Sequence, residues 1–170
     1  MTWNDQFLSL FERCLAKYQN GDKDFTGYYN KEELTFLNSI GYKPREFFDF
    51  VEDFGDQGDP TLSTAVLVAA VRRDYFLVVQ EGKPSSLEIT TSDLPTFGDK
   101  LGDFPYLARI TTKAKHKLRG ELDPDIMYGC GGDRNFLKNH GNIHPADFLR
   151  HVWASEGDDA KIVAYVQSHL

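Results

Sequence analysis

Residues 21–44, GDKDFTGYYNKEELTFLNSIGYKP, recur in outline about one hundred positions later in the chain. The pairs of matching type are Tyr28 and Tyr128, Phe36 and Phe136, Leu37 and Leu137, Gly41 and Gly141, and, after one inserted residue, Pro44 and Pro145, Phe47 and Phe148, and Val51 and Val152. Ordered matches at a nearly constant spacing indicate an internal repeat, and a unit of about 70 residues has a thin core when it stands alone. We therefore predict an all-α protein in which two tandem helical repeats, of about three to four helices each, pack as one compact body.

Apolar residues recur at spacings of three and four through most of the chain, which is the pattern of amphipathic helices. This periodicity predicts helices over residues 7–18, 33–40, 44–54 and about 60–80, and another from residue 107 to a stop at Gly120. Residues 81–102 are rich in Gly, Pro, Ser, Thr and Asp, so we expect a linker there, with at most a short strand at residues 87–90. The expected organisation is a degenerate repeat over residues 1–80, a linker over 81–102 and a second repeat over 103–170.

The composition argues against several classes of protein. The chain has 170 residues, 41% of them hydrophobic, and its net charge of −7 disfavours nonspecific binding to nucleic acid or to an anionic membrane. The longest apolar run, residues 65–71, is too short for a membrane span, and no signal peptide is recognisable at the start. With only two cysteines, Cys14 and Cys130, we expect free thiols and a cytoplasmic, reducing compartment.

The acidic part of the opening stretch fits a calcium-binding EF-hand loop. The residues at the liganding positions are Asp22, Asp24, Thr26, Tyr28 through its carbonyl, Asn30 and Glu33. Two features weaken this interpretation: residues 20–21 break the helix that should lead into the loop, and bulky Phe25 and Tyr29 stand where small and aliphatic residues are usual. In addition, EF-hands function as pairs, and the second copy, GELDPDIMYGCGGDRNFL, lacks the ligand series. We favour an acidic, solvated loop with Asn30 as a helix cap, and keep calcium binding as the alternative.

The second copy contains a series of residues that resembles a known family. The series is Lys100-Leu101-Gly102, Leu107, Arg109, Lys113, Gly120-Glu121-Leu122, Tyr128, Cys130, Asp133 and Phe136-Leu137. With these residues, positions 98–168 resemble the bacterial domain-of-unknown-function family 5069, although Thr112 stands where the family tends to have Asp and Tyr165 where it tends to have Trp. The resemblance implies a helical fold and a shared architecture, and the family carries no assigned activity to transfer. The first copy resembles the family only through the internal repeat, so we expect it to be degenerate and to contribute structure rather than chemistry.

Basic residues of the second copy form a candidate anion site. Arg109, Lys113 and Lys117 recur every four residues and so lie on one face of the helix expected at residues 107–119, with His116 beside them. The next helix is expected to open at Gly131 and Gly132, where unpaired backbone amides favour an anion, and the list of candidate ligand-binding residues is completed by Tyr128, Asp133 and Arg134. The competing interpretation is a solvated basic face that balances neighbouring acids such as Glu121 and Asp123, with glycines present for turn geometry.

Cys130 supports a second, catalytic interpretation of the same region. A cysteine at a helix start among cationic side chains is a candidate nucleophile, with His116 or His140 as the base. The competing interpretation is a buried cysteine that only packs. A zinc site formed by Cys130, His140, His144 and His151 is less favoured, because Gly141 and Pro145 separate the histidines into different helices.

Two functional hypotheses therefore stand. The favoured one is a binding module for a small anionic ligand or a protein partner, and its alternative is a small enzyme that acts on an anionic metabolite through Arg109, Lys113 and Cys130, with His116 as a further candidate. No cofactor, nucleic acid or membrane is expected as a partner, and formation of a homo-oligomer is left open.

Overall fold

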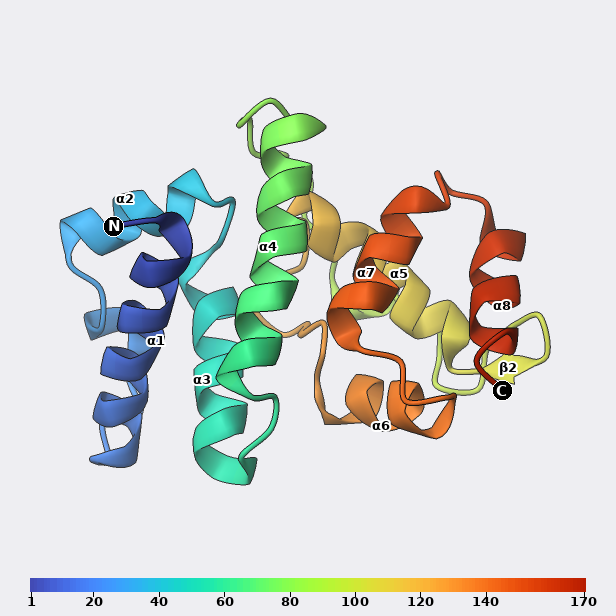
Figure 1. Ribbon diagram of the computed structural model, residues 1–170, viewed down its shortest axis with the longest axis horizontal. Helices are drawn as coiled ribbons and strands as arrows, with labels where there is room; N and C mark the ends of the chain where they lie inside the picture. The colour runs from blue at the N-terminus through green and yellow to red at the C-terminus, as the bar shows by residue number, and fades with distance from the viewer. The chain divides into compact units, whose positions relative to one another are not determined.

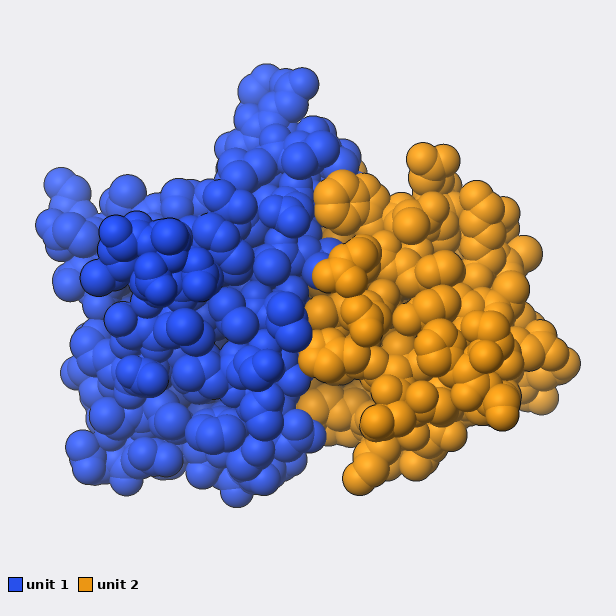
Figure 2. Space-filling model, viewed as in Figure 1, with its two compact units in different colours: residues 1–84 blue, residues 85–170 orange.

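The first 84 residues form four α-helices, as their apolar periodicity predicts. In the computed structural model, which describes all 170 residues, the chain divides into two units, residues 1–84 and residues 85–170 (Figures 1 and 2). The elements of the first unit are α1 (Trp3–Gln19), the short 3-10 helix η1 (Phe25–Gly27), α2 (Lys31–Ser39), α3 (Pro44–Gln57) and α4 (Leu62–Val78). The protein is mostly helical, as expected.

Local sequence signals explain where these helices begin. Thr2, Asn30 and Thr61 are the N-caps of α1, α2 and α4, and each side chain accepts a hydrogen bond from a backbone N–H of the first turn. At α3 the start is marked by Pro44, which occupies the first helical turn, where proline is tolerated. The expectation that Asn30 caps a helix is confirmed.

An aromatic cluster forms the core of the first unit. The Phe7 ring on α1 meets the Phe47 ring on α3 edge to face at 4.9 Å, and Phe11 meets the same ring at 6.0 Å. All three side chains are essentially inaccessible to solvent. Because such pairs contribute about 0.5–1.5 kcal/mol beyond area burial, they are an important reason why α1 packs on α3.

The second unit is also built on four α-helices but carries a small hairpin as well. Its elements are the short 3-10 helix η2 (Thr91–Asp93), the strands β1 (Lys100–Leu101) and β2 (Phe104–Pro105), α5 (Leu107–Arg119), α6 (Gly131–Asn139), α7 (Pro145–Ala154) and α8 (Asp159–Gln167). The strands pair antiparallel, with Lys100 opposite Pro105 and Leu101 opposite Phe104. The all-α expectation therefore needs this correction. The helices bury Ile110, Phe148 and Ile162 completely, and α5 packs on α7.

The segment expected to be a linker, residues 81–102, belongs mostly to the second unit. Ile89 bridges to Leu122, its N–H donates to the Glu121 carbonyl at 2.8 Å, and its own carbonyl accepts from the Asp123 N–H at 3.2 Å. The expected strand at residues 87–90 is reduced to this single bridge. Since its backbone groups find partners more than thirty positions away, residues 85–102 form a packed part of the unit, and the boundary between units lies at Pro84 and Ser85.

None of the helices has the length and apolar content needed to cross a membrane.

Candidate functional site

A cavity of about 190 Å³ in the second unit brings together three of the predicted site residues, Arg109, Lys113 and Cys130. The first two lie one turn apart on α5, and Cys130 is the N-cap of α6. The remaining lining residues are Thr91, Leu94, Phe97, Tyr106, Asp125, Ile126 and Met127. The wall thus combines α5 with two loop segments, one of which was expected to be part of the linker.

A buried ion pair forms the polar end of this cavity. The Lys113 ammonium lies 2.6 Å from Oδ2 of Asp133, and their side chains are 5% and 0% exposed. The same ammonium also donates to the Cys130 thiol, with Nζ 3.3 Å from Sγ. Asp133 is satisfied on its other sides by the Gly129 N–H at 2.9 Å and the Tyr106 hydroxyl at 2.7 Å. Every polar atom in this cluster is held by its neighbours, which makes the cluster a rigid and preorganised unit.

Tyr106 is a member of the site that the sequence analysis did not identify. It lies just before α5 with a positive φ of 73°, and its hydroxyl would be 2.9 Å from a Cβ at Gly132, so a side chain there would crowd the ring. Burial, the charge of Asp133 and the hydrogen bond to that carboxylate raise the pKa of the Tyr106 phenol above its usual value. The phenol therefore stays protonated and donates to Asp133. No local sequence pattern distinguishes this tyrosine from the others.

Arg109 is the most accessible cation of the cavity. Its guanidinium donates one hydrogen bond, from Nη1 to the Pro95 carbonyl at 2.8 Å, and lies over the Phe97 ring at 4.3 Å. Phe97 is 69% exposed, which is unusual for a large aromatic side chain. The remaining guanidinium donors are available for bidentate hydrogen bonds to a carboxylate or a phosphate.

Several predicted residues serve the fold instead of lining the cavity. His116 pairs through Nδ1 with Glu121 at 2.7 Å and does not reach Cys130, so the expected pairing of Cys130 with a His116 base is not formed. Lys117 is buried on α5, and the buried Tyr128 donates its hydroxyl to the Pro145 carbonyl at 2.7 Å. Arg134 donates to the Gly129 carbonyl, and Gly131 and Gly132 form the exposed first turn of α6.

The basic face of α5 is largely balanced by acids within the unit. Arg119 pairs with Glu121 at 2.8 Å and Lys115 pairs with Asp159 at 2.7 Å. The competing interpretation, a solvated basic face that balances acids such as Glu121 and Asp123, fits Arg119 and Lys115. It is wrong for Lys113 and Lys117, because both side chains are buried. Burial by itself raises the pKa of Glu121, but hydrogen bonds from Ser85, Arg119 and His116 outweigh it and the pKa is lowered.

The acidic loop of the first unit places its groups differently from an EF-hand. The Glu33 carboxylate accepts two hydrogen bonds from the Arg13 guanidinium, at 2.6 and 2.9 Å, and one from the Asn30 N–H at 2.9 Å. The Tyr28 carbonyl, a predicted ligand, accepts from Arg13 at 2.7 Å. Asp24 accepts from the Thr26 N–H and caps η1, while the Asp22 carboxylate accepts from the Asp24 N–H. No group of three or more His, Cys, Asp or Glu side chains is placed so that it could hold a metal ion, either in this loop or among the histidines considered for zinc.

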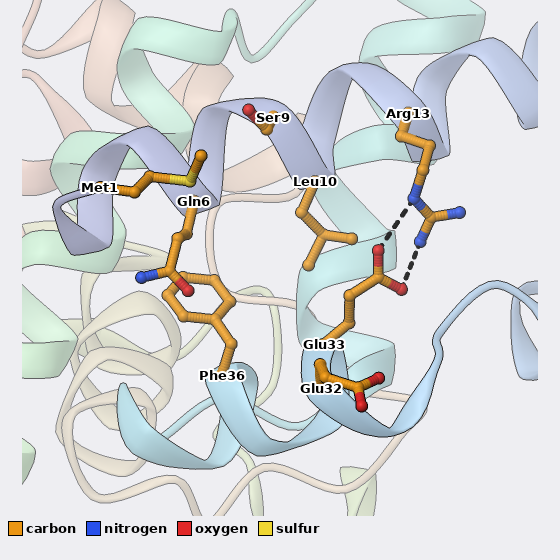
Figure 3. A pocket seen from close by; sticks show the side chains of 8 residues that line it. All are labelled: Met1, Gln6, Ser9, Leu10, Arg13, Glu32, Glu33 and Phe36. Carbon is orange, nitrogen blue, oxygen red and sulfur yellow. Dashed lines mark hydrogen bonds and ion pairs between the residues drawn. The ribbon is translucent and has the colours of Figure 1, made fainter.

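The first unit has a cavity of its own between α1 and α2, of about 220 Å³ (Figure 3). Arg13 on α1 and Glu33 on α2 point toward each other across it, and Ser9, Leu10 and Phe36 also line it. This ion pair, with side chains 39% and 21% exposed, is less buried than the ion pair between Lys113 and Asp133 in the second unit.

No family model matches the chain, and no curated protein or solved structure matches it either. The resemblance of residues 98–168 to family 5069 stays a prediction, and the site must be interpreted from its own geometry.

Proposed function

We propose that the second unit binds a small anionic ligand in the cavity lined by Arg109, Lys113 and Cys130. The observation that carries this proposal is the Arg109 guanidinium, which faces a cavity of about 190 Å³ and uses only one hydrogen bond to the protein. The exposed Phe97 ring beneath it holds the guanidinium plane without consuming its donors. A carboxylate or phosphate can then be bound in bidentate fashion.

Lys113 has a supporting role in this proposal, because Asp133 already compensates its charge. Asp125 also lines the cavity and is exposed, so it disfavours ligands with a high negative charge. The chemistry of the wall fits a singly charged anion with a small apolar part that contacts Leu94 and Ile126.

The test compares two arginine variants of the full chain. Inorganic phosphate, acetate and benzoate are titrated into labelled protein while NMR amide shifts are followed. Arg109→Met should weaken the binding of the best of these anions about tenfold or more, because a charge-assisted bidentate contact is lost. Arg150→Met is the matched control, since Arg150 is an exposed arginine of α7 that pairs with Asp147. Unchanged affinity in Arg109→Met, an equal loss in the control, or no binding of any of the three anions would reject the proposal.

A second candidate function, that of a small enzyme, is favoured by one distance. The Lys113 ammonium lies 3.3 Å from the Cys130 sulfur and can assist proton transfer at that atom. In this version Arg109 holds an anionic substrate, Cys130 is the nucleophile, and the Lys113 ammonium stabilises negative charge that develops at the sulfur. Lys113 does not replace the base expected of His116, because an ammonium that is paired with Asp133 has no lone pair to accept a proton.

Alkylation of the native protein by iodoacetamide tests the catalytic version. Cys130 lines the cavity and should react, whereas Cys14 is fully buried in the first unit and serves as the internal control. Lys113→Met should slow the reaction of Cys130. An unchanged rate in this variant would leave Lys113 without a role at the sulfur and would count against the enzyme.

We also infer that the two units are copies of one ancestral helical unit, and the ion pairs support this inference. Arg13 pairs with Glu33 and Lys113 pairs with Asp133, all at a spacing of one hundred residues, and in each unit the acid is the third residue of its helix. The cavity residues Ser9 and Arg109 also correspond at this spacing. The first copy therefore keeps the structural pair but has a serine where the second has its anion-binding arginine, which agrees with a degenerate copy.

A reducing, cytoplasmic compartment is our proposal for the location of the protein, and the two free thiols are compatible with it. A protein partner and a homo-oligomer stay secondary proposals.

A further inference from the structure

We propose that Lys113 and Cys130 are the two ends of an oxidation-dependent covalent bridge in which one oxygen atom joins Nζ to Sγ. The inference starts from a thiol sulfur and a lysine nitrogen held 3.3 Å apart at the wall of an open cavity. It goes beyond ligand binding, and its test does not depend on the proposed function.

The surroundings fix both atoms in place. Asp133 holds the Lys113 ammonium at 2.6 Å and is itself held by the Gly129 N–H and the Tyr106 hydroxyl. Cys130 is the N-cap of α6, so its backbone is part of a helix start and cannot drift away from the amine. A bridge through one oxygen requires only a small approach of the two atoms, whereas a direct bond between sulfur and nitrogen requires a much larger one.

The cavity gives a small oxidant access to the sulfur. Cys130 is partly exposed and lines a space of about 190 Å³, which is ample for dioxygen or hydrogen peroxide. Cys14, in contrast, is fully buried in the first unit, and burial raises the pKa of its thiol to about 12. Only one of the two thiols therefore combines access with a neighbouring amine.

The reaction balances with dioxygen as the oxidant. Counted from the thiol and the Lys113 ammonium, one dioxygen gives the bridge S–O–NH, one water and one released proton. The S–H bond, two N–H bonds and the O–O bond break, and one S–O bond, one O–N bond and the two O–H bonds of water form. Sulfur and nitrogen each lose two electrons, and the two oxygen atoms accept all four. A dithiol such as dithiothreitol reverses the reaction: two equivalents supply four electrons and restore the thiol and the amine with release of one water.

Closing the bridge changes the electrostatics of the site. It removes the positive charge of Lys113, which leaves the buried carboxylate of Asp133 with only its two neutral donors. The polar end of the cavity then becomes more negative, so oxidation is expected to disfavour an anion in the cavity.

Intact mass spectrometry of the full chain tests the bridge. Protein kept in air-saturated buffer is compared with protein kept under dithiothreitol. The bridge adds one oxygen and removes two hydrogens, a gain of about 14 Da that dithiothreitol should abolish. After tryptic digestion a single cross-linked species should join the segments that contain Lys113 and Cys130, with no cleavage after Lys113.

Three variants control the measurement. Cys130→Ser and Lys113→Arg should lose the gain in mass, whereas Cys14→Ser should keep it. Lys113 is buried, so circular dichroism is recorded for each variant to show that it is folded. The cross-linked peptide of the unmodified chain tests the bridge without any variant. A gain of about 16 or 32 Da on Cys130 alone would mean simple sulfur oxidation and would overturn the proposal. Disulfide-linked dimers through Cys130, or no change in mass, would overturn it equally.

Discussion

Replacing Lys113 with methionine is expected to destabilise the second unit by about 3 kcal/mol, because it leaves a carboxylate buried without its counter-ion. Asp133 is 0% exposed and lies 2.6 Å from the Lys113 ammonium. Removal of one partner from a buried pair costs about 3–5 kcal/mol. The carboxylate keeps the hydrogen bonds from Gly129 and Tyr106, which places the expected loss at the lower end of this range.

Two further variants separate the unpaired charge from lost packing. In Lys113→Met with Asp133→Asn the charge is gone while an amide oxygen can still accept from Gly129, so the double variant should recover about 1–2 kcal/mol relative to Lys113→Met. The matched control is Arg13→Met in the first unit. Its partner Glu33 is 21% exposed and can be solvated, and the expected loss there is about 1 kcal/mol or less.

Urea unfolding followed by tryptophan fluorescence measures these differences. The chain has two tryptophans, one in each unit, and Trp3→Phe leaves Trp153 as the reporter of the second unit. The reasoning is refuted if Lys113→Met is destabilised no more than Arg13→Met, or if the double variant is less stable than Lys113→Met.

Two other predictions concern pH and backbone conformation. The pKa of Glu121 is lowered below its ordinary value of 4.5, so the ionised carboxylate stabilises the fold above that pH and the contribution is lost as the pH falls through the depressed pKa. The melting temperature of Glu121→Gln should therefore fall less steeply with decreasing pH in this acidic window than that of the unmodified chain. Thermal melts recorded over a series of pH values measure both slopes, and equal slopes would contradict the prediction. Gly141→Ala should cost about 2 kcal/mol or more, because Gly141 has a φ of 85° and a Cβ there would lie 2.4 Å from the His169 carbonyl oxygen. Gly157→Ala, at a φ of 83° with open space, is the control and should cost about 1 kcal/mol, so equal shifts in melting temperature would rule out the contact as the cause.

The helices could be predicted from the sequence because their signals are local. The spacing of Phe7 and Phe11 predicts the buried face of α1, and Pro44 and Gly120 mark the start of α3 and the end of α5. Residues 85–102 could not be predicted in this way. Their composition is that of a linker, and the bonds that order them run from Ile89 to residues 121–123, which local composition does not encode.

The candidate site was predictable only in part. The four-residue spacing of Arg109 and Lys113 places both on one face of α5, and a glycine-rich helix start indicates that Cys130 lies at an N-terminus. The different roles of the two cations depend on how far each side chain is buried, which the spacing of basic residues does not encode. Lys113 is buried against Asp133, whereas the more accessible Arg109 faces the cavity. The role of Tyr106 depends on a positive φ before α5, for which a tyrosine is not a usual signal.

Cys130 occupies a helix N-cap, where a residue with a capping side chain would stabilise the fold. A substitution at this position can therefore distinguish a functional role of the cysteine from a role in packing. Its backbone has N-cap geometry, with φ −64° and ψ 172°, but its side chain makes no capping hydrogen bond. Asn30, at φ −80° and ψ 177°, accepts from the N–H of the third helical residue of α2. Asparagine is among the best N-caps, so Cys130→Asn should stabilise the second unit by about 0.5–1 kcal/mol if Cys130 is retained for its chemistry. The same urea titration decides the matter. A variant that is less stable than the unmodified chain would show that the sulfur is needed for packing. A gain in stability would show that this position gives up a better helix cap in order to keep a thiol.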